Sequence, residues 1–549
     1  MYTFYLTGKI FLLSNIDIIT QNEVIFLTKI AIAQIEIRSG RPDLNTKKMR
    51  QFISEAKRQD ANFIIFPGLS ITGRMTGKKS DSFLKDCEMY KQEIVGASRN
   101  TIILFENEPN HCLIAKNGKL INPHLDFAAI LSNSTFVFGE ESIFKPATNM
   151  PTIFVNAIGL YDHGKTIYTL GGGSTVCNSR GRVVFKSPMF QESLDFIDFD
   201  EIDSMVTINE RPDSKIEQIY QAIHYGVKAF LENIGMKKIV IGISGGIDSA
   251  VDAALYTKIL GAENVLLVNM PSVYNSATTR NLSEQLAKNL GCHYMVVPIQ
   301  ESVDLTIKQL ESIPMLFLGD GSARNINLSQ FVRENIQARD RSSRILAALA
   351  AAFGGGFTCN ANKAETTVGY ATMYGDSAGV LSALADLWKC QVYALADYIN
   401  ARVYEREVIP KGIIEIVPSA ELSTAQNVDE GKGDPLKYPY HDYLLRAFVE
   451  RNVTPEDVLT WYMDKTLEQK IGCDIGLVKK YFTTDESFIA DVERWWNLFK
   501  GIAVAKRLQA PPLIAITNHA FGSDYPESQT GAYYTQNYQS LKTKILQGK

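Results

Sequence analysis

Residues 241–250 read IGISGGIDSA, an apolar run that ends in a glycine turn and leads into a helical segment. The two glycines let the backbone turn sharply, so that amide N–H groups and the helix N-terminus point at one spot and favour an anion there. The serines add hydroxyl donors, and the aspartate adds a carboxylate suited to a hard cation. The stretch therefore predicts a phosphate and Mg²⁺ cradle, made by Ser244, Gly245, Gly246, Asp248 and Ser249.

The same stretch excludes two common phosphate loops. No Gly-Lys-Ser/Thr string follows it, as a Walker A loop requires, and the GxGxxG spacing of a dinucleotide fingerprint is absent. The plainest alternative is a glycine turn with an ordinary serine or aspartate helix cap.

Strand-like and helical segments alternate around this loop. An amphipathic helix is predicted before it, with an apolar stripe that runs from Ile216 to Phe230. The order predicts parallel strands with right-handed helical crossovers, which is a doubly wound sheet that binds ligands at the carboxyl ends of its strands. The predicted helices cover residues 214–235, 249–261 and 281–291, and the predicted strands cover 237–244, 264–272 and 293–300.

The first part of the chain also predicts an α/β unit, because strand-like runs alternate with polar stretches from Lys29 to about Asp200. A chain of 549 residues is too long for one hydrophobic core. The polar, turn-rich segment 203–214 is the best linker, so we predict domains at 1–205 and 206–549. The strand-like runs lie at 29–37, 62–67, 100–105, 152–160 and 182–185.

The composition of the chain limits which classes of binding partner and which cellular compartment we expect for it. A formal net charge of −4 argues against broad binding to nucleic acid or to an anionic membrane. The seven cysteines are scattered and never form a CxxC pair, which indicates a reducing cytoplasm without structural zinc. The apolar N-terminal residues 1–15 lack the basic region and cleavage site of a signal peptide, and we interpret them as a strand or an extension.

The SGGIDS string resembles the pyrophosphate loop of ATP pyrophosphatases, which split ATP between its α and β phosphates to make an adenylate. Further blocks follow in an order and spacing that resemble NAD⁺ synthetase, specifically the synthetase domain of its long, glutamine-dependent form. The resemblance covers about residues 210–525 and implies an ATP pyrophosphatase fold of the adenine nucleotide alpha hydrolase-like type. The blocks are NMPSVYNSATT, ENIQARDRSSR, CNANKAETTVGYATMYGDSAG, DLWKCQVYALA, PSAEL and KRLQAPP.

The resemblance implies that ATP converts deamido-NAD (nicotinate adenine dinucleotide) to an acyl-adenylate, and that ammonia then displaces AMP. It also implies at least a homodimer. By the family pattern, Asp248 and Glu365 would hold Mg²⁺, and Asp248, Lys389 and Asp376 would be catalytic. The implied ATP-binding residues are Ser244, Gly245, Gly246, Asp248, Ser249, Lys389 and Ser419. The implied deamido-NAD-binding residues are Asn335, Arg339, Glu365, Asp376 and Lys506.

Each of these residues has a plainer interpretation. Taken alone, Lys389 or Lys506 would more often be a solvated lysine and Asp376 a turn residue. Arg339 and Arg341 would more often belong to a charged helix face. Only the agreement in the order of the blocks makes the functional interpretation the stronger one.

Two details depart from the family or from its chemistry. A basic residue commonly follows the MPS string, whereas Val273 occupies that place here, and the neighbouring Arg280 is a candidate substitute. Cys359 raises the alternative of a thiol mechanism, as in tRNA-thiolating relatives. A small buried residue is the favoured interpretation of Cys359, because no second cysteine is near it in the sequence and no basic RNA-binding region is present.

The N-terminal part resembles the nitrilase-like glutaminase that precedes this synthetase, with its α-β-β-α layers, but the chain between its opening and its close is short. Such glutaminases need a nucleophilic Cys, a Glu base and a Lys for the tetrahedral intermediate. Gly68 stands at the Glu position of the FPELS-type motif, and the Lys-bearing and Cys-bearing strings are absent. We predict a degenerate, truncated scaffold, direct use of ammonia and a possible separate glutaminase.

Three alternatives remain open from sequence. One is a rearranged live amidase that recruits Cys112 with Lys116 or Lys119. Another is a different adenylating enzyme, such as a tRNA thiolase. The third is a degenerate protein that binds or senses nucleotides without turnover.

Overall fold

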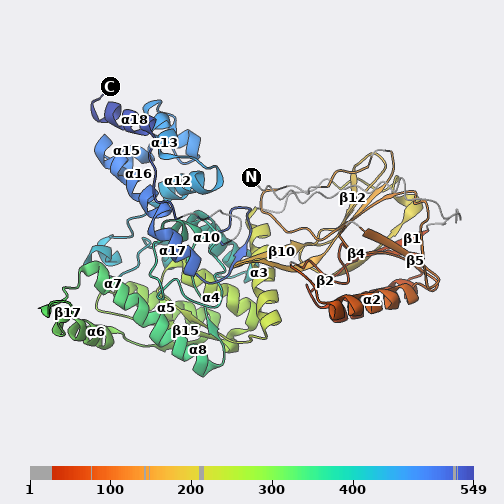
Figure 1. Cartoon of the computed structure of the whole chain (residues 1–549), viewed down its shortest axis with the longest axis horizontal. Helices are drawn as coiled ribbons and strands as arrows, with labels where there is room; N and C mark the ends of the chain where they lie inside the picture. Colours follow the sequence, from red (N-terminus) through yellow and green to blue (C-terminus); the bar gives the residue numbers. More distant parts are fainter. Residues whose placement is uncertain are drawn as a thin grey trace. The chain divides into compact units, whose positions relative to one another are not determined.

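The computed structural model describes residues 28–75, 77–109, 111–140, 144–147, 149–208, 215–522, 527 and 529–548 (Figure 1). The chain forms two compact units. The first extends through Asp162 and resumes from Ile167 to Ala229, and the second comprises His163–Thr166 and everything from Phe230 onward. The predicted strand or extension at residues 1–15 and part of the predicted linker 203–214 lie outside the described residues, and the predicted boundary between 205 and 206 stays a prediction.

The first unit is mainly β-structure. Its strands include β1 (Lys29–Gln34), β2 (Glu36–Ile37), β3 (Phe63–Ile65), β4 (Ile102–Glu108), β5 (His111–Lys116), β6 (Lys119–Ile121), β7 (Ala128–Ser132), β8 (Thr152–Asn156), β9 (Ile158–His163), β10 (Thr166–Gly171), β11 (Thr175–Cys177), β12 (Val183–Lys186) and β13 (Ser193–Asp198). Its helices include α1 (Pro42–Arg58), α2 (Asp81–Gly96) and most of α3 (Lys215–Ile234). The predicted amphipathic helix at 214–235 is confirmed by α3.

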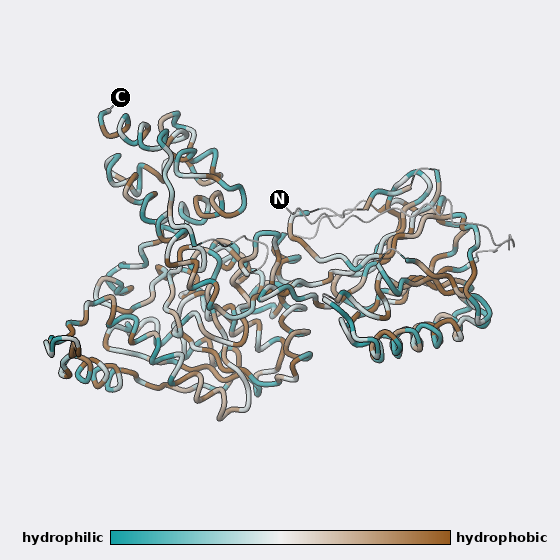
Figure 2. Tube along the Cα trace, viewed as in Figure 1, coloured by the Kyte–Doolittle hydropathy of each residue, from teal (hydrophilic) through white to brown (hydrophobic). Residues whose placement is uncertain are grey.

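Two sheets of this unit pack face to face. The larger sheet has the order β13-β1-β3-β4-β5-β6, and β1, β3 and β4 are parallel in it. The apolar stripe of α1, formed by Met49, Ile53 and Ala56, packs with α2 on one face of this sheet. The other face packs against a sheet with the order β12-β11-β8-β7. Figure 2 shows hydrophobic residues concentrated in the strands of this unit, and β1, β3 and β4, at the centre of the larger sheet, are buried almost throughout because both of its faces are covered.

The predicted single strand at 29–37 is wrong in one respect. The chain leaves the large sheet after Gln34, and β2 pairs with β9 instead. Pairing with a second sheet requires the strand to break, and Ile35 lies at the break, buried in the core.

The second unit contains a parallel sheet with the order β16-β15-β14-β19. All three neighbouring pairs are parallel, so the predicted doubly wound sheet is confirmed. The strands of this unit are β14 (Ile239–Gly242), β15 (Val265–Asn269), β16 (His293–Val296), β17 (Met315–Phe317), β18 (Ser322–Arg324), β19 (Gly356–Phe357) and β20 (Leu513–Ala515).

The crossover helices of the sheet are α4 and α5, as predicted, although α5 begins at Ala277 rather than at 281 because Ser276 caps it. The helices of this unit include α4 (Ile247–Leu260), α5 (Ala277–Leu290), α6 (Gln300–Ser312), α7 (Gln330–Arg339), α8 (Ala347–Phe353), α9 (Lys363–Val368), α10 (Lys389–Tyr398), α11 (Lys411–Glu415), α12 (Tyr438–Glu450), α13 (Pro455–Met463), α14 (Leu467–Ile471), α15 (Leu477–Tyr481), α16 (Asp485–Lys500), α17 (Ile502–Gln509) and α18 (Gln536–Leu546). None of the helices in the described ranges is both long and apolar enough to cross a membrane.

Candidate active site

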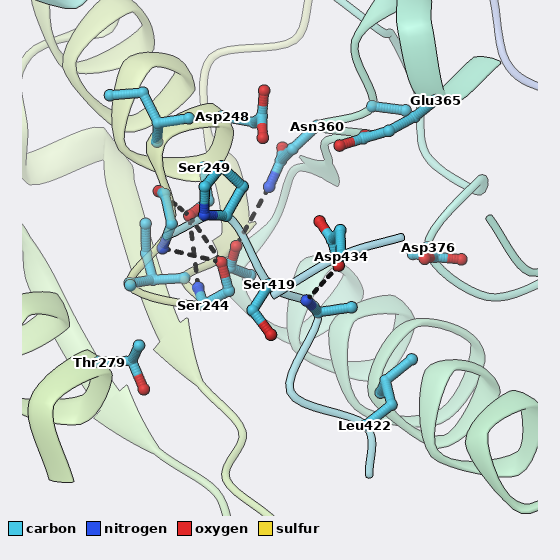
Figure 3. A pocket seen from close by; sticks show the side chains of 18 of the residues that line it. Ser244, Asp248, Ser249, Thr279, Asn360, Glu365, Asp376, Ser419, Leu422 and Asp434 are labelled. Atoms are coloured by element: carbon cyan, nitrogen blue, oxygen red, sulfur yellow. Dashed lines mark hydrogen bonds between the residues drawn. The ribbon is translucent and has the colours of Figure 1, made fainter. Parts of the chain in front are cut away.

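The strand order places a crevice at the carboxyl end of β14. The chain leaves β14 through α4 to reach β15 on one side, while β19 lies on the other side, so the loops that follow β14 and β19 diverge. A pocket of about 250 Å³ opens between these loops. Figure 3 shows Ser244 and Ser249 after β14 and Asn360 after β19 around this space.

The loop after β14 is held in one conformation by its own side chains. The Gly246 N–H donates to Ser244 Oγ at 3.1 Å, and Ser249 Oγ donates to the Gly246 carbonyl at 3.1 Å. Gly245 has φ +85°, and a Cβ on it would lie 2.4 Å from the Thr279 carbonyl oxygen. Glycine is therefore required at 245 both by its backbone conformation and by the close approach of α5.

Three charged side chains from three different segments meet in the pocket. Lys389 Nζ, at the start of α10, lies 2.5 Å from Asp248 Oδ2 and 3.4 Å from Glu365 Oε1. Lys389 is only 3% exposed, so it is not a solvated lysine. Burial opposes the charge on Lys389, but the two carboxylates raise its pKa above the ordinary value.

A third carboxylate, that of Asp434, lies close enough to act on Lys389 and Glu365. Burial raises the pKa of Glu365 to about 8; Lys389 opposes this shift, whereas the nearby Asp248 and Asp434 carboxylates add to it. Burial likewise raises the pKa of Asp434. A site in which several carboxylates resist ionisation together is one that a further cation would stabilise.

Asp434 was not predicted from sequence. It lines the pocket, accepts from the Ala420 N–H at 3.0 Å, and accepts from the Tyr370 hydroxyl at 3.0 Å. It follows a loop with no motif that would single it out, and only the folded chain brings it near Glu365.

Asn362 was also missed, although a sequence signal was present. Its side chain caps α9 and accepts from the Glu365 N–H at 3.1 Å, while its Nδ2 donates to Asp248 Oδ1 at 3.1 Å. The spacing Asn-x-x-Glu is that of a capping box, which predicts a helix start at this position. Asn362 thus ties the loop after β14 to the helix that carries Glu365.

Asp376 lies at the pocket wall, where the Thr372 N–H donates to its Oδ1 at 2.5 Å. Burial raises the pKa of Asp376, and Lys506 and Arg341 oppose that shift. The carboxylate is thus fixed by the segment that precedes it rather than exposed in a turn.

The other three residues implied for deamido-NAD do not line the pocket. Instead, all three contact the segment 369–373 that leads to Asp376. Asn335 Oδ1 accepts from the Thr372 hydroxyl, Arg339 Nε donates to the Met373 carbonyl, and Lys506 Nζ donates to the Gly369 carbonyl.

The interpretation of Arg341 as part of a charged helix face is wrong. It lines the pocket, and its guanidinium donates to the Met270 carbonyl at 3.0 Å and to Asn275 Oδ1 at 3.1 Å. Burial lowers the pKa of Arg341 to about 10. Ser419, predicted for the triphosphate, also lines the pocket and donates from Oγ to the Gln426 carbonyl at 2.6 Å.

Val273, Arg280 and Cys359 do not line the pocket. Val273 is 68% exposed, and Arg280 is exposed with its Nε directed to the Ser276 carbonyl. Neither side chain lines the pocket, so Arg280 does not substitute for a basic residue at 273 in this structure. Cys359 is buried, and burial raises the pKa of its thiol to about 11, which is the opposite of an activated nucleophile.

In the first unit, the end of β3 holds Gly68 beside a buried carboxylate. A Cβ on Gly68 would lie 2.8 Å from Glu106 Oε2, and the Leu69 N–H donates to that oxygen at 3.0 Å. Glu106, from the adjacent strand β4, is 7% exposed. The space that a side chain at position 68 would enter is therefore filled by Glu106.

Cys112 lies directly across from Glu106 in the pairing of β4 with β5. Burial, and secondarily the Glu106 carboxylate, raise the pKa of Cys112 to about 12. Lys116 lies four residues further along the same strand, which places its Cα about 13 Å from that of Cys112. Lys119 pairs with Lys116 across the hairpin and is exposed.

Comparison with known proteins agrees with this geometry. The NAD synthase family matches residues 219–475. The glutamine-dependent NAD(+) synthetase of Synechocystis sp. is 32% identical over 427 residues, which cover 76% of this chain and 68% of the relative.

The chain belongs to the glutamine-dependent NAD(+) synthetase family. It is an ATP-dependent amide ligase that converts deamido-NAD to NAD, with a nitrilase-like N-terminal part and an NAD synthase domain of the ATP pyrophosphatase type.

Two solved structures share the fold of this NAD(+) synthetase over nearly its whole length. The enzyme of Acinetobacter baumannii, in complex with ADP, is 23% identical with a TM-score of 0.59 and covers 92% of this chain and 99% of its own. The enzyme of Cytophaga hutchinsonii is 14% identical with a TM-score of 0.72 and covers 95% of this chain and 100% of its own.

Proposed function

We propose that this NAD(+) synthetase activates deamido-NAD as an acyl-adenylate and takes its nitrogen directly from ammonia rather than from glutamine. In the first step a nicotinate carboxylate oxygen attacks the α-phosphorus of ATP, and the bond to the β-phosphate breaks with release of pyrophosphate. In the second step the nitrogen lone pair of ammonia attacks the acyl carbon. The bond to AMP then breaks, and the nitrogen loses one proton.

The observation that carries the first step is the convergence of Asp248, Glu365 and Lys389 on the loop after β14. In this proposal the loop N–H groups and Lys389 bind the phosphates, with Ser244, Ser249 and Ser419 as hydroxyl contacts. Asp376 and the residues that fix it, Asn335, Arg339 and Lys506, would place the dinucleotide.

Mg²⁺ fits the residues present. Asp248 and Glu365 supply two carboxylates, and both now contact a cation, the Lys389 ammonium. The described residues contain no group of three or more His, Cys, Asp or Glu side chains that could hold a metal. A two-carboxylate site completed by phosphate oxygens and water is the usual Mg²⁺ arrangement. When bound, the ion would neutralise the charge that develops on the phosphates.

The arrangement of the described residues near Gly68 and Cys112 supports ammonia as the donor. Gly68 offers no carboxylate, the Cys112 thiol is held protonated, and neither Lys116 nor Lys119 is placed to stabilise an oxyanion beside Cys112. A nucleophile, a base and a cation must converge on one point, and these residues do not. A separate glutaminase would then be the source of ammonia where glutamine is the nitrogen store.

The test compares nitrogen donors at equal concentration. Purified protein with ATP, Mg²⁺ and deamido-NAD should form NAD, AMP and pyrophosphate with an ammonium salt, and no NAD above background with glutamine. A glutamine-driven rate equal to the ammonium rate, and abolished by Cys112→Ala, would show a rearranged live amidase. Nucleotide binding without AMP release under saturating substrates would instead favour the sensing alternative.

We also propose a cytoplasmic homodimer or larger homo-oligomer. All seven cysteines are free thiols, as a reducing compartment requires. In the second unit, large apolar side chains are exposed on and beside the β17–β18 hairpin, which indicates a surface covered by another chain. Sedimentation at micromolar concentration should show a particle at least twice the 61.2 kDa chain mass. The exposed side chains are Ile313, Met315, Leu316, Phe317, Leu318 and Phe331.

A further inference from the structure

A fully buried ion pair lies behind the active-site pocket. Lys363 Nζ donates to Asp386 Oδ1 at 2.6 Å, and the two side chains are 0% and 1% exposed. Neither residue lines the pocket. Two charges withdrawn this completely from water lose their hydration, and apolar residues of similar volume are often at least as stabilising. The pair therefore calls for a role other than stability.

Its place in the chain suggests that role. Lys363 is the first residue of α9, between Asn362, which donates to Asp248, and Glu365. Asp386 lies three residues before Lys389, the first residue of α10. The Lys363 N–H also donates to the Leu387 carbonyl at 2.7 Å. The ion pair thus joins the two helix starts that carry Glu365 and Lys389.

The charged groups of the pair have further hydrogen-bond partners. Asp386 Oδ2 accepts from the backbone N–H groups of Ile516 and Thr517, at 2.8 and 2.7 Å, just after β20. Lys363 Nζ donates a second bond to Thr517 Oγ1 at 3.1 Å and lies 5.4 Å from the centre of the Trp388 ring. A buried network in which every member is satisfied has one favoured geometry and transmits it to the segments attached to it.

We propose that Lys363 and Asp386 are positioning residues that hold Glu365 and Lys389 at their working distance from Asp248. This inference rests on the proposed roles of Glu365 and Lys389. Glu365 Oε1 and Asp248 Oδ2 must stay within reach of one cation while the nucleotide binds and reacts. A clamp behind the first turns of α9 and α10 supplies that constraint without occupying the pocket.

Loss of the Lys363–Asp386 ion pair should lower metal affinity and kcat while the protein still folds. The fold would survive if both charges were removed together, because no buried charge is then left alone. The carboxylates and the lysine would keep their chemistry but lose their alignment. The expected loss is about 10–100-fold in metal affinity and in kcat, as for other residues that orient metal ligands. The KM for deamido-NAD would change much less, because Asp376 and the segment 369–373 lie outside the clamp.

The test uses a Lys363→Met/Asp386→Asn double variant, in which the amide oxygen still accepts from the Ile516 and Thr517 N–H groups, and a Lys363→Met single variant. Mn²⁺ binding in the presence of ATP, followed by electron paramagnetic resonance, reports the geometry without turnover. The matched control is Lys542→Met/Glu493→Gln, which removes a 2.6 Å ion pair between α18 and α16. The double variant should melt close to the wild type, bind Mn²⁺ about tenfold more weakly and lose kcat, while the control keeps both values.

The outcomes separate positioning from plain core packing. A folded double variant with wild-type Mn²⁺ binding and wild-type kcat would overturn the inference. If the double variant does not fold, Lys363→Met decides, because Asp386 keeps the bonds from the Ile516 and Thr517 N–H groups and from the Thr517 hydroxyl. Unchanged Mn²⁺ binding in that variant overturns the inference as well. If the wild type makes no NAD, the proposed function fails, and the Mn²⁺ comparison still tests the clamp.

Discussion

The two units each present a glycine at the carboxyl end of a parallel strand, and the two glycines do opposite things. Gly245, after β14, lets the chain turn so that a loop, a helix start and two other segments converge on one pocket. Gly68, after β3, has no side chain, and Glu106 from the next strand lies in the space that one would enter. The architecture of a strand end thus permits a site but does not create one. What matters is which groups the neighbouring segments bring to it.

The largest effect is expected at the strand end after β14, beside Asp248. Asp248→Ala should lower ammonium-dependent NAD formation about a thousandfold or more, because a Mg²⁺ ligand and the partner of Lys389 are lost together. AMP release under saturating substrates measures it. Asp397→Ala, at an exposed position on α10, is the matched control and should retain the wild-type rate. A rate above half of wild type in Asp248→Ala would show that the carboxylate is not a metal ligand.

Adding a methyl group at the same strand end should be the next most damaging change. Gly245→Ala places a Cβ 2.4 Å from a backbone oxygen of α5, at a φ of +85°. Strain and overpacking together should cost about 2–5 kcal/mol, measured by urea unfolding, and should weaken ATP binding. Gly291→Ala, at the end of α5, has open space around its Cβ and separates the cost of a positive φ from the cost of the clash. Equal losses in the two variants would contradict the close-approach argument.

The strand end at Gly68 should respond differently to a larger group. Gly68→Glu would place a Cβ 2.8 Å from the end of the Glu106 side chain and 3.1 Å from the backbone of Leu131 and Ser132, without a strained φ, so a smaller loss of about 1–3 kcal/mol is expected. Adding Glu106→Ala should recover the part of that loss that comes from the Glu106 carboxylate. Neither variant should release ammonia from glutamine if, as proposed, this strand end has no nucleophile or cation placed beside it. Glutamine hydrolysis by Gly68→Glu alone would mean that the remaining partners are already in place.

The smallest effect is expected at Cys112. Cys112→Ala should leave the ammonium-driven rate unchanged, because the thiol is half-buried, protonated and far along the strand from Lys116. Cys87→Ala, a buried cysteine of the same unit, is the control for general effects of removing a thiol. If glutamine supports NAD formation in the wild type and only Cys112→Ala abolishes it, the two strand ends would both be catalytic and the contrast between them would fail.

The alternation of strands and helices, and the glycine turn at 244–249, were predictable from sequence because period and turn chemistry are local properties. The same holds for α3, whose apolar stripe was visible before folding. The split of the strand at Ile35 was not predictable, since it depends on β9, which lies more than a hundred residues away. Arg341 shows the same limit: on its own helix it is one more charge, and only the approach of residues 270 and 275 turns it into part of a pocket.

By itself, the sequence determined the doubly wound sheet, the glycine turn after β14, the carboxylate of Asp248 beside that turn and the glycine at position 68. Each of these is carried by residues close together in the chain, whose backbone preferences and chemistry do not need distant partners. Tertiary structure decided that Lys389 lies between Asp248 and Glu365, that Asp434 and Asn362 belong to the site, and that Glu106 fills the space beside Gly68. These contacts join segments that are separate in the sequence, so burial and electrostatic coupling exist only after the chain has folded.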